Sequence, residues 1–237
     1  MISISHAINT NRLLADLPSA EQAALAACCE VVPLAFGEVI YQPTDTVTYA
    51  YFPIDSFVSN IVILNNDSRL EVTMAGLEGM LGIALVLGFN KAPLLAVVQG
   101  AGVALRIPAT QFQALLPSSP TLHQRLIRYL YIVMNQLANS AACIHFHRIE
   151  ERLARWLLMT QDRAQSDHLQ LTHEFLAMML GVRRAGITLA ALALQQRGLI
   201  SYHRGDIIIL NRSGLVAAAC QCYTHDCTLY ANAMATP

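Results

Sequence analysis

The chain has 237 residues, of which 54 % are hydrophobic and only 13 % charged, and its formal net charge is −1. A chain of this length and apolarity can bury a substantial core, so the composition excludes a mainly disordered protein. The longest stretch without Asp, Glu, Lys or Arg is interrupted by polar residues, and the N-terminus resembles no signal peptide. Six unevenly spaced cysteines suit reduced thiols. We therefore expect a cytoplasmic protein without a membrane partner.

The charge is unevenly distributed along the chain. Residues 1–140 hold 6 basic and 9 acidic side chains, whereas residues 141–237 hold 9 basic and 7 acidic ones. Fourteen of the fifteen cations are arginine, whose planar guanidinium suits bidentate contact with phosphate or guanine. This distribution favours an anionic partner for the C-terminal part.

The first hundred residues change from a helical to a β pattern. Apolar residues at helical spacing within 10–29 predict two short helices separated at Pro18. From Glu30 to Pro108 short apolar runs alternate with turn signals such as PTD at 43–45 and NND at 65–67. The runs are VVPLAF, GEVIYQ, YAYFPI, FVSNIVIL, RLEVTMAG, LLAVVQ and GVALRIP. Strands at this regular spacing predict an antiparallel sandwich or barrel.

A long helix is predicted next, from Pro120 to about Ile144. Its apolar or small positions alternate in steps of four and three, which is the spacing of a coiled-coil seam. These positions are Leu126, Leu130, Val133, Leu137, Ser140 and Ile144. We interpret the first four as a homodimer interface. The alternative is a helix that packs these residues on the core of its own chain.

The C-terminal part reads as a winged helix-turn-helix. A helix over 148–163 and a polar loop precede a helix that begins at Thr172 and ends at Gly181. A second helix follows to about Arg197, and two β runs joined at 204–206 predict a hairpin. In such a module the second helix enters the major groove of double-stranded DNA, while the first helix and the wing hold phosphates.

The position of each polar residue in this module predicts its contact. Arg183 and Arg184 stand at the start of the second helix, where they can reach the groove and its phosphates, and Thr188 can make a polar base contact. Backbone contacts are expected from Thr172, His173, His203 and Arg204.

The run LTHEFLAMMLGVRRAGITLAALALQQRGLISYHRGDIIILNRSGL resembles the C-terminal domain of the Crp/Fnr superfamily of bacterial transcription regulators. The resemblance extends over nearly the whole chain and implies an α+β protein. It would have a jelly-roll-like antiparallel β-roll sensor at 1–117, a dimerisation helix at 118–147 and the DNA-binding domain at 148–237. It further implies a homodimer on a two-fold symmetric operator, with RNA polymerase as a further partner.

The sequence departs from the family pattern in the effector pocket. Cyclic-nucleotide binders of this type have a Gly-Glu pair and an Arg followed by Ser or Thr, whereas the corresponding positions here are Ile83, Leu94 and Leu95. A cyclic phosphate would find no cation or hydroxyl there. We therefore expect no cyclic AMP binding in the family manner. The effector can be an apolar molecule, a protein or none.

A second departure lies in the recognition helix. Relatives commonly have Glu, Thr and a further Arg after the first Arg, but this chain has Ala185, Gly186 and Leu189. Periodicity places Ile187, Ala190, Ala191 and Leu194 on the core face, so Leu189 and Leu192 point outward. They either contact thymine methyl groups or form a protein-docking surface in a module that no longer reads DNA.

Other candidate sites carry less weight. The tail contains Cys220, Cys222, His225 and Cys227, but paired zinc-binding cysteines are usually two to four residues apart. We therefore expect buried or surface thiols without a metal, and the alternatives are a redox role or a metal site. The histidines His123, His145 and His147 are interpreted as structural, and a haem ligand among them is the alternative. No catalytic motif or cofactor loop is found, so the sequence predicts neither an enzyme nor a bound cofactor.

Overall fold

The computed structural model of the chain describes residues 2–64 and 68–235, and the turn predicted at 65–67 lies outside them. The chain divides into two compact units. The first unit contains Met1–Asn60, Thr73–Val133 and Ala233–Pro237, and the second contains Ile61–Val72 and Met134–Asn232. The domain boundaries at 117 and 147 stay a prediction.

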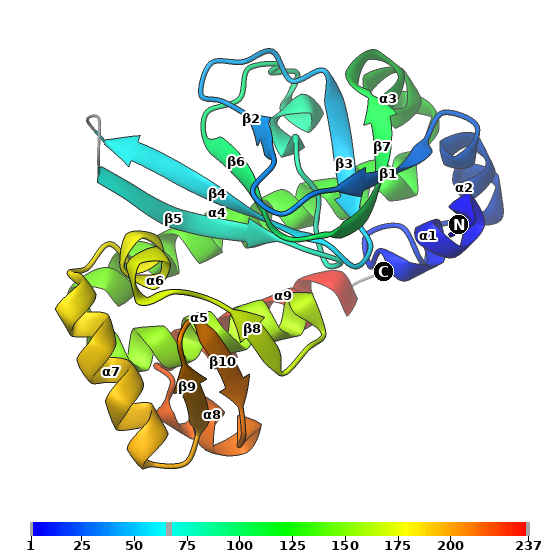
Figure 1. The fold of residues 1–237 in the computed structure, drawn as a ribbon. Coiled ribbons are helices and arrows are strands. Elements are labelled where there is room, and N and C mark those ends of the chain that lie inside the picture. The colour runs from blue at the N-terminus through cyan, green and yellow to red at the C-terminus, as the bar shows by residue number, and fades with distance from the viewer. Residues whose placement is uncertain (1, 65–67, 236–237) are drawn as a thin grey trace. The chain divides into compact units, whose positions relative to one another are not determined.

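The strands of the N-terminal region form two sheets, drawn in blue to green in Figure 1. Their orders are β1-β7-β3 and β2-β6-β4-β5. The strands are β1 (Glu30–Leu34), β2 (Val39–Tyr41), β3 (Tyr49–Pro53), β4 (Phe57–Leu64), β5 (Ser68–Ala75), β6 (Leu95–Gly100) and β7 (Gly102–Pro108). The pairs β1–β7, β3–β7 and β2–β6 are antiparallel. Each predicted β run therefore corresponds to a strand, and the expected antiparallel β-roll is confirmed.

The helices of this region are short. They are α1 (Ile4–Thr10), α2 (Ser19–Ala26), the 3-10 turn η1 (Ile83–Leu87), α3 (Ala109–Leu115) and the 3-10 turn η2 (Leu116–Ser118). The prediction of a helix after residue 10 was wrong, because α1 ends there. The buried side chain of Asn11 accepts a bond from the Leu13 N–H and donates to the carbonyl oxygens of Pro53 and Gly79, which holds the chain in a turn.

The core of the first unit lies between the strands and helices. Alternate residues of β7 point inward, so that Leu105 and Ile107 are fully buried. Arg106 points the other way, where it pairs with Glu30 at 2.7 Å and covers the ring of Tyr49. The period-2 pattern of the sequence therefore separates the core from the polar surface.

The long helix α4 runs from Pro120 to Phe146, as its periodicity predicted. Leu122, Leu126, Tyr129 and Ile132 are buried, and the first three belong to the core of the first unit. Large apolar side chains also follow another stripe of this helix that is exposed: Ile127, Tyr131, Met134, Leu137 and Ile144. The helix α4 therefore has two apolar stripes, one buried in its own chain and one exposed.

The second unit contains α5 (Ile149–Ala164), β8 (His168–Gln170), α6 (His173–Leu180), α7 (Arg184–Gln196), β9 (Ile200–His203), β10 (Asp206–Ile209), α8 (Arg212–Ala218) and α9 (Cys222–Ala235). The strands form an antiparallel sheet of order β8-β10-β9. The winged helix-turn-helix is thereby confirmed as a fold. β8 was not predicted, because its three residues lie in a polar loop sequence.

Glycine and capping residues define the turns as the sequence predicted. The Thr172 hydroxyl accepts a hydrogen bond from the Phe175 N–H at 3.1 Å and so caps α6. Gly181 ends α6 in the left-handed conformation, with φ at 62°. The hairpin turns at Arg204 and Gly205, both with positive φ, as a two-residue turn with the native twist requires.

A buried ion pair connects α5 with α9. The Arg155 guanidinium donates to the Asp226 carboxylate at 2.8 Å, and both side chains are over nine-tenths buried. The second carboxylate oxygen of Asp226 accepts from the Asn139 amide of α4 at 2.7 Å. Removing one partner of such a pair typically costs about 3–5 kcal/mol, because it leaves an uncompensated buried charge.

Within residues 2–64 and 68–235, no single helix combines the length and apolarity needed to cross a membrane, although α6 and α7 together meet that criterion across a bend of 107°.

Candidate nucleic-acid interface

The helices α6 and α7 meet at a steep angle, as Figure 1 shows. The bend between them is 107°, within the range of helix-turn-helix motifs. Gly186 in the first turn of α7 allows a close approach, because an added Cβ would lie 2.8 Å from the Ile149 Cδ1 of α5. Among the described residues, the only atom that this added Cβ would meet within 4 Å is the flexible end of the Ile149 side chain.

The two faces of α7 separate as the periodicity predicted. Ile187, Ala190, Ala191 and Leu194 are buried, and they form the core-facing stripe. On the other face Leu189 is 68 % exposed and Leu192 is 49 % exposed. The expected pair of outward leucines is confirmed, which leaves the role of this apolar surface to be explained.

Arg183 and Arg184 begin α7, with Arg183 at the N-cap, and both are exposed. His203 and Arg204 are exposed at the wing turn. The Thr172 methyl group is 3.6 Å from a Cβ built on Gly205, so the start of α6 adjoins the wing. The exposed polar residues of α6, α7 and the wing thus belong to the same helix-turn-helix and wing.

His173 and Thr188 are engaged within the protein. The Thr188 hydroxyl lies 3.0 Å from His173 Nδ1 and 3.1 Å from the Arg184 carbonyl oxygen. Burial, followed by the nearby Arg184 charge, lowers the pKa of His173 below its usual value of 6.5. His173 Nε2 is buried and has no hydrogen-bond partner among the described residues. These side chains therefore stiffen the contact between α6 and α7, and their hydroxyl and imidazole are partly satisfied before any ligand binds.

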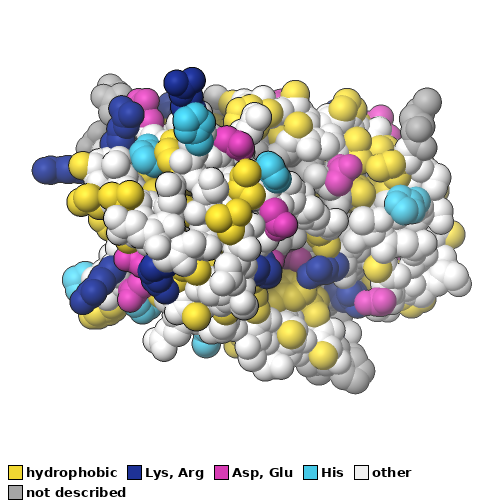
Figure 2. Space-filling view, turned by 60° about the horizontal axis from the view of Figure 1, so that its bottom comes forward, with side chains coloured by type: hydrophobic (Ala, Val, Ile, Leu, Met, Phe, Trp, Pro, Cys, Tyr) yellow, Lys and Arg dark blue, Asp and Glu magenta, His cyan; other side chains and the backbone are white. Residues whose placement is uncertain are grey.

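Some arginines of this unit form salt bridges with described residues and others do not. Arg197 pairs with Glu150 at 2.8 Å, Arg212 with Asp162 at 2.7 Å, and Arg155 with Asp226. Among the described residues none forms a salt bridge with Arg183, Arg184 or Arg204. On the face drawn in Figure 2, Lys and Arg side chains stand singly or in small groups among other types. An anion would meet a few uncompensated arginines at the helix entry and the wing.

The helix-turn-helix and the wing match a known protein family. The family model described as a Crp-like helix-turn-helix domain matches residues 151–218. Residues 151–218, called the Crp-like domain below, are therefore similar to this family. The matched residues extend from α5 to the end of α8, so the Crp-like domain includes both helices and the wing. A comparison with curated protein sequences found no significant match.

Solved structures of Crp/Fnr regulators share the fold over most of the chain. A transcriptional regulator of this family from Eubacterium rectale is 17 % identical, with a TM-score of 0.67 over 87 % of this chain and 96 % of its own. FixK2 from Bradyrhizobium japonicum is 15 % identical, with a TM-score of 0.69 over 81 % and 98 %. The c-di-GMP responsive regulator CLP from Xanthomonas campestris is 16 % identical, with a TM-score of 0.66 over 81 % and 99 %. The expected resemblance to the Crp/Fnr superfamily is thus confirmed for residues 151–218 by the family model, and the solved structures show a shared fold.

The three residues expected in the effector pocket are buried or half-buried. Ile83 begins η1 directly after Gly82 and packs against the core of the first unit. Leu95, in β6, is buried, and Leu94 directly before it is half-buried. The structure thus places no cation or hydroxyl at these positions, and their role in binding an effector stays a prediction.

The residues expected at the dimer interface have different environments. Leu126 is 0 % exposed and is enclosed by the core of its own chain, so it is not available to a partner. Leu130 and Val133 are half-buried, and Leu137 is exposed. The exposed apolar stripe lies one residue further along, at Ile127, Tyr131 and Met134. The structure thus removes Leu126 from the surface of this chain, and the dimer interface itself stays a prediction.

The cysteine-rich tail also differs from its expected grouping. Cys220 and Cys222 meet Cys143 and His147 from the end of α4, whereas His225 and Cys227 do not join them. The hydrogen bond between Cys143 and Cys220, together with weaker effects of His147 and Arg155, lowers the pKa of the Cys143 thiol to about 5. The same bond raises the pKa of Cys220. The spacing of Cys143 and His147, four residues apart at the end of α4, is a sequence signal for these two members only, because Cys220 and Cys222 are distant in the sequence.

Proposed function

We propose that this protein is a DNA-binding transcription regulator of the Crp/Fnr type that binds a two-fold symmetric operator as a homodimer in the cytoplasm. The observation that carries the proposal is the set of uncompensated arginines, Arg183, Arg184 and Arg204, on a Crp-like helix-turn-helix domain. Buried or ion-paired arginines would serve the fold, whereas exposed and unpaired ones can neutralise phosphates. No catalytic role is proposed.

The proposed contacts are shared between two helices and the wing. Arg184 would reach a base edge in the major groove, and Arg183 an adjacent phosphate. His203 and Arg204 would hold the backbone beside the wing, and Thr172 the phosphate nearest to α6. The His173 and Thr188 side chains would position α7 first and contact DNA only through their remaining hydrogen-bonding capacity.

The exposed leucines suggest what kind of base pair is read. Leu189 and Leu192 follow Arg184 along α7 and carry no hydrogen-bonding groups, so they would discriminate by contact with thymine methyl groups. The operator half-site would then combine a guanine for Arg184 with neighbouring A·T pairs.

Homodimerisation would use the exposed stripe of α4. Two copies would bury Ile127, Tyr131 and Met134 against one another and present two recognition helices about one helical turn of DNA apart. An effector would act by favouring one arrangement of the two subunits, because a ligand shifts an equilibrium only through different affinities for the two states. Apolar residues at Ile83, Leu94 and Leu95 favour an effector other than cyclic AMP, and RNA polymerase would be a further partner.

The proposal is tested by selecting bound sequences from a random DNA pool and measuring the salt dependence of binding. We expect a symmetric consensus and an affinity that falls steeply as salt rises. The same selection with R12A, which removes an exposed arginine outside the Crp-like domain, should return the same consensus. Failure to enrich any sequence, with salt-independent binding, would contradict the proposal.

One observation favours a second candidate function. The exposure of both Leu189 and Leu192 also fits a protein-docking surface on a module that no longer reads DNA. The double variant L189A/L192A separates the two functions. If the leucines read thymine, the variant loses preference among DNA sequences but keeps its affinity for random duplexes; a docking module would show weak DNA binding before and after the change.

A further inference from the structure

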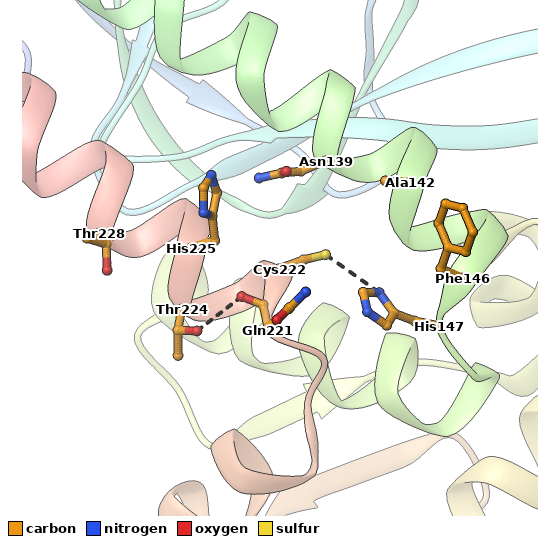
Figure 3. A pocket seen from close by; sticks show the side chains of 9 residues that line it. All are labelled: Asn139, Ala142, Phe146, His147, Gln221, Cys222, Thr224, His225 and Thr228. Atoms are coloured by element: carbon orange, nitrogen blue, oxygen red, sulfur yellow. Dashed lines mark hydrogen bonds between the residues drawn. The ribbon is translucent and has the colours of Figure 1, made fainter.

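Four side chains with metal-binding atoms converge where α4 ends and α9 begins. Cys143 lies in the last turn of α4, His147 directly follows that helix, and Cys220 and Cys222 flank the start of α9. Their ligand atoms all lie within 4.8 Å of one another. Figure 3 shows Cys222 and His147 pointing toward each other, with Cys222 Sγ 3.6 Å from His147 Nδ1. Cys143 Sγ is 3.5 Å from Cys220 Sγ.

These separations agree with the demands of a tetrahedral zinc ion. Zn–S bonds of about 2.3 Å and Zn–N bonds of about 2.0 Å place two sulfur ligands about 3.8 Å apart, and sulfur and nitrogen about 3.5 Å apart. The observed 3.5 Å and 3.6 Å are within a few tenths of an ångström of these values. We propose that Cys143, His147, Cys220 and Cys222 bind one Zn²⁺ ion.

Local structure explains why the ligands converge. Residues 143 and 147 are four apart, so a helix brings them to the same face one turn from each other. Cys220 is held by its N–H, which donates to the Glu151 carbonyl oxygen at 3.4 Å, and its own carbonyl oxygen accepts from the Tyr223 N–H at 3.1 Å. The C-x-C spacing, too tight for a zinc knuckle by itself, is completed here by a second pair from a distant helix.

The chemistry of the set also favours zinc. Three thiolates and one imidazole form a Cys₃His site, and the soft sulfur donors select zinc over magnesium or calcium. The three cysteines are buried in a cluster of their own. Arg155 lies close enough to interact electrostatically with Cys143 and Cys220, and it would offset the single negative charge of the loaded site. Because all four positions are supplied by the protein, the site is structural and not catalytic.

The ion has a route to its ligands. Cys222 and His147 line an open pocket of about 620 Å³, together with Asn139 and His225 (Figure 3). Bound zinc would join the end of α4 to the segment between α8 and α9, and so fix the last helix of the second unit. This role is independent of any DNA target.

The test uses the full-length chain, reduced and freed of metal. Zn²⁺ titrated against a chromophoric chelator should bind one equivalent per chain, and Co²⁺ should give the intense visible bands of a tetrahedral site together with thiolate charge-transfer absorption. Each of C143S, C220S, C222S and H147A should weaken binding by about 100-fold or more. The matched controls C227S and H225A change a nearby exposed thiol and a histidine of the same pocket, and they should bind as the wild type does.

Two outcomes would overturn the site. One is wild-type binding no tighter than that of C143S, or a Co²⁺ spectrum without thiolate bands. The other is a Cys143–Cys220 disulfide in the purified protein, detected as a loss of two hydrogens by mass, that after reduction leaves a chain with no metal affinity. Since the Co²⁺ spectrum of the wild type needs no variant, misfolding of a cysteine variant does not remove the test.

Discussion

His173 of α6 stacks on Tyr202 of β9, with ring centroids 4.2 Å apart and planes inclined by only 12°. The same imidazole contacts the Thr188 hydroxyl of α7. One side chain therefore joins both helices of the helix-turn-helix to the wing. A change in the protonation state of His173 would therefore affect the contacts among both helices and the wing.

Replacing His173 with Phe should flatten the pH dependence of stability. The folded state holds the pKa of His173 below its usual 6.5, so the unfolded chain binds the proton more readily. The stabilisation from the neutral ring is present above pH 6.5 and is lost as the pH falls through the lowered pKa of the folded state. Urea unfolding midpoints measured from pH 5 to 8 should fall toward low pH less steeply in H173F than in the wild type. Parallel curves would show that His173 does not contribute.

Arg184 and Arg204 should affect DNA binding differently. If Arg184 contacts a guanine, R184A should cost about 1–3 kcal/mol for the selected operator and relax the preference at one base pair. R204A should weaken binding uniformly across sequences and reduce the salt slope by about one. Affinities from fluorescence anisotropy at several salt concentrations separate the two effects. Equal losses on specific and random DNA in R184A would remove it from base reading.

Two glycines of the helix-turn-helix should respond in opposite ways to alanine. Gly181 has a positive φ, and an added Cβ would lie 2.8 Å from Leu70 Cδ1, so G181A should destabilise the fold by roughly 1–2 kcal/mol. Gly186 is helical, and its Cβ would meet only the flexible end of Ile149. Because alanine favours a helix by about 1 kcal/mol, G186A should be neutral or stabilising. Denaturant unfolding of both variants checks this, and a strongly destabilised G186A would contradict it.

Substitutions on α4 should separate dimerisation from folding. Met134 is 62 % exposed, so M134E should shift the protein toward a folded monomer in analytical ultracentrifugation without lowering its thermal midpoint at high dilution. The fully buried Leu126 should behave as a core residue, and L126A should lose about 2–5 kcal/mol of unfolding free energy. If L126A instead dissociated an otherwise stable dimer, the assignment of the two stripes would be reversed.

Much of the fold followed from local signals. The predicted β runs became strands because their alternation, their turn residues and their lengths all indicated strands. Thr172 and Gly181 begin and end α6 as predicted, because capping depends on neighbouring residues only. The helix predicted after residue 10 failed because Asn11 satisfies backbone groups that are distant in the sequence. Such tertiary hydrogen bonds of one side chain do not change the hydrophobic periodicity of the sequence, so the periodicity cannot reveal them.

The candidate sites were less predictable for the same reason. The stripes through Leu126 and Ile127 are adjacent on one helix, and periodicity cannot tell which one the chain itself covers. Cys143 and Cys220 are 77 residues apart, so neither spacing within the tail nor spacing within α4 could bring them together. The place of Arg184 at the start of α7 could be predicted, because the start of a helix is recognised from neighbouring residues in the sequence.

The Arg155–Asp226 pair has a bearing on how this protein can be dissected. The family match ends at residue 218, before Asp226, so a fragment cut to it would leave Arg155 charged and without its counter-ion. A fragment that starts at α5 would lose the Asn139 amide that also holds Asp226. The stretch that matches the family model therefore leaves out both Asp226 and Asn139. A fragment that keeps these bonds has to span at least 139–226, and the compact unit to which they belong also includes Ile61–Val72.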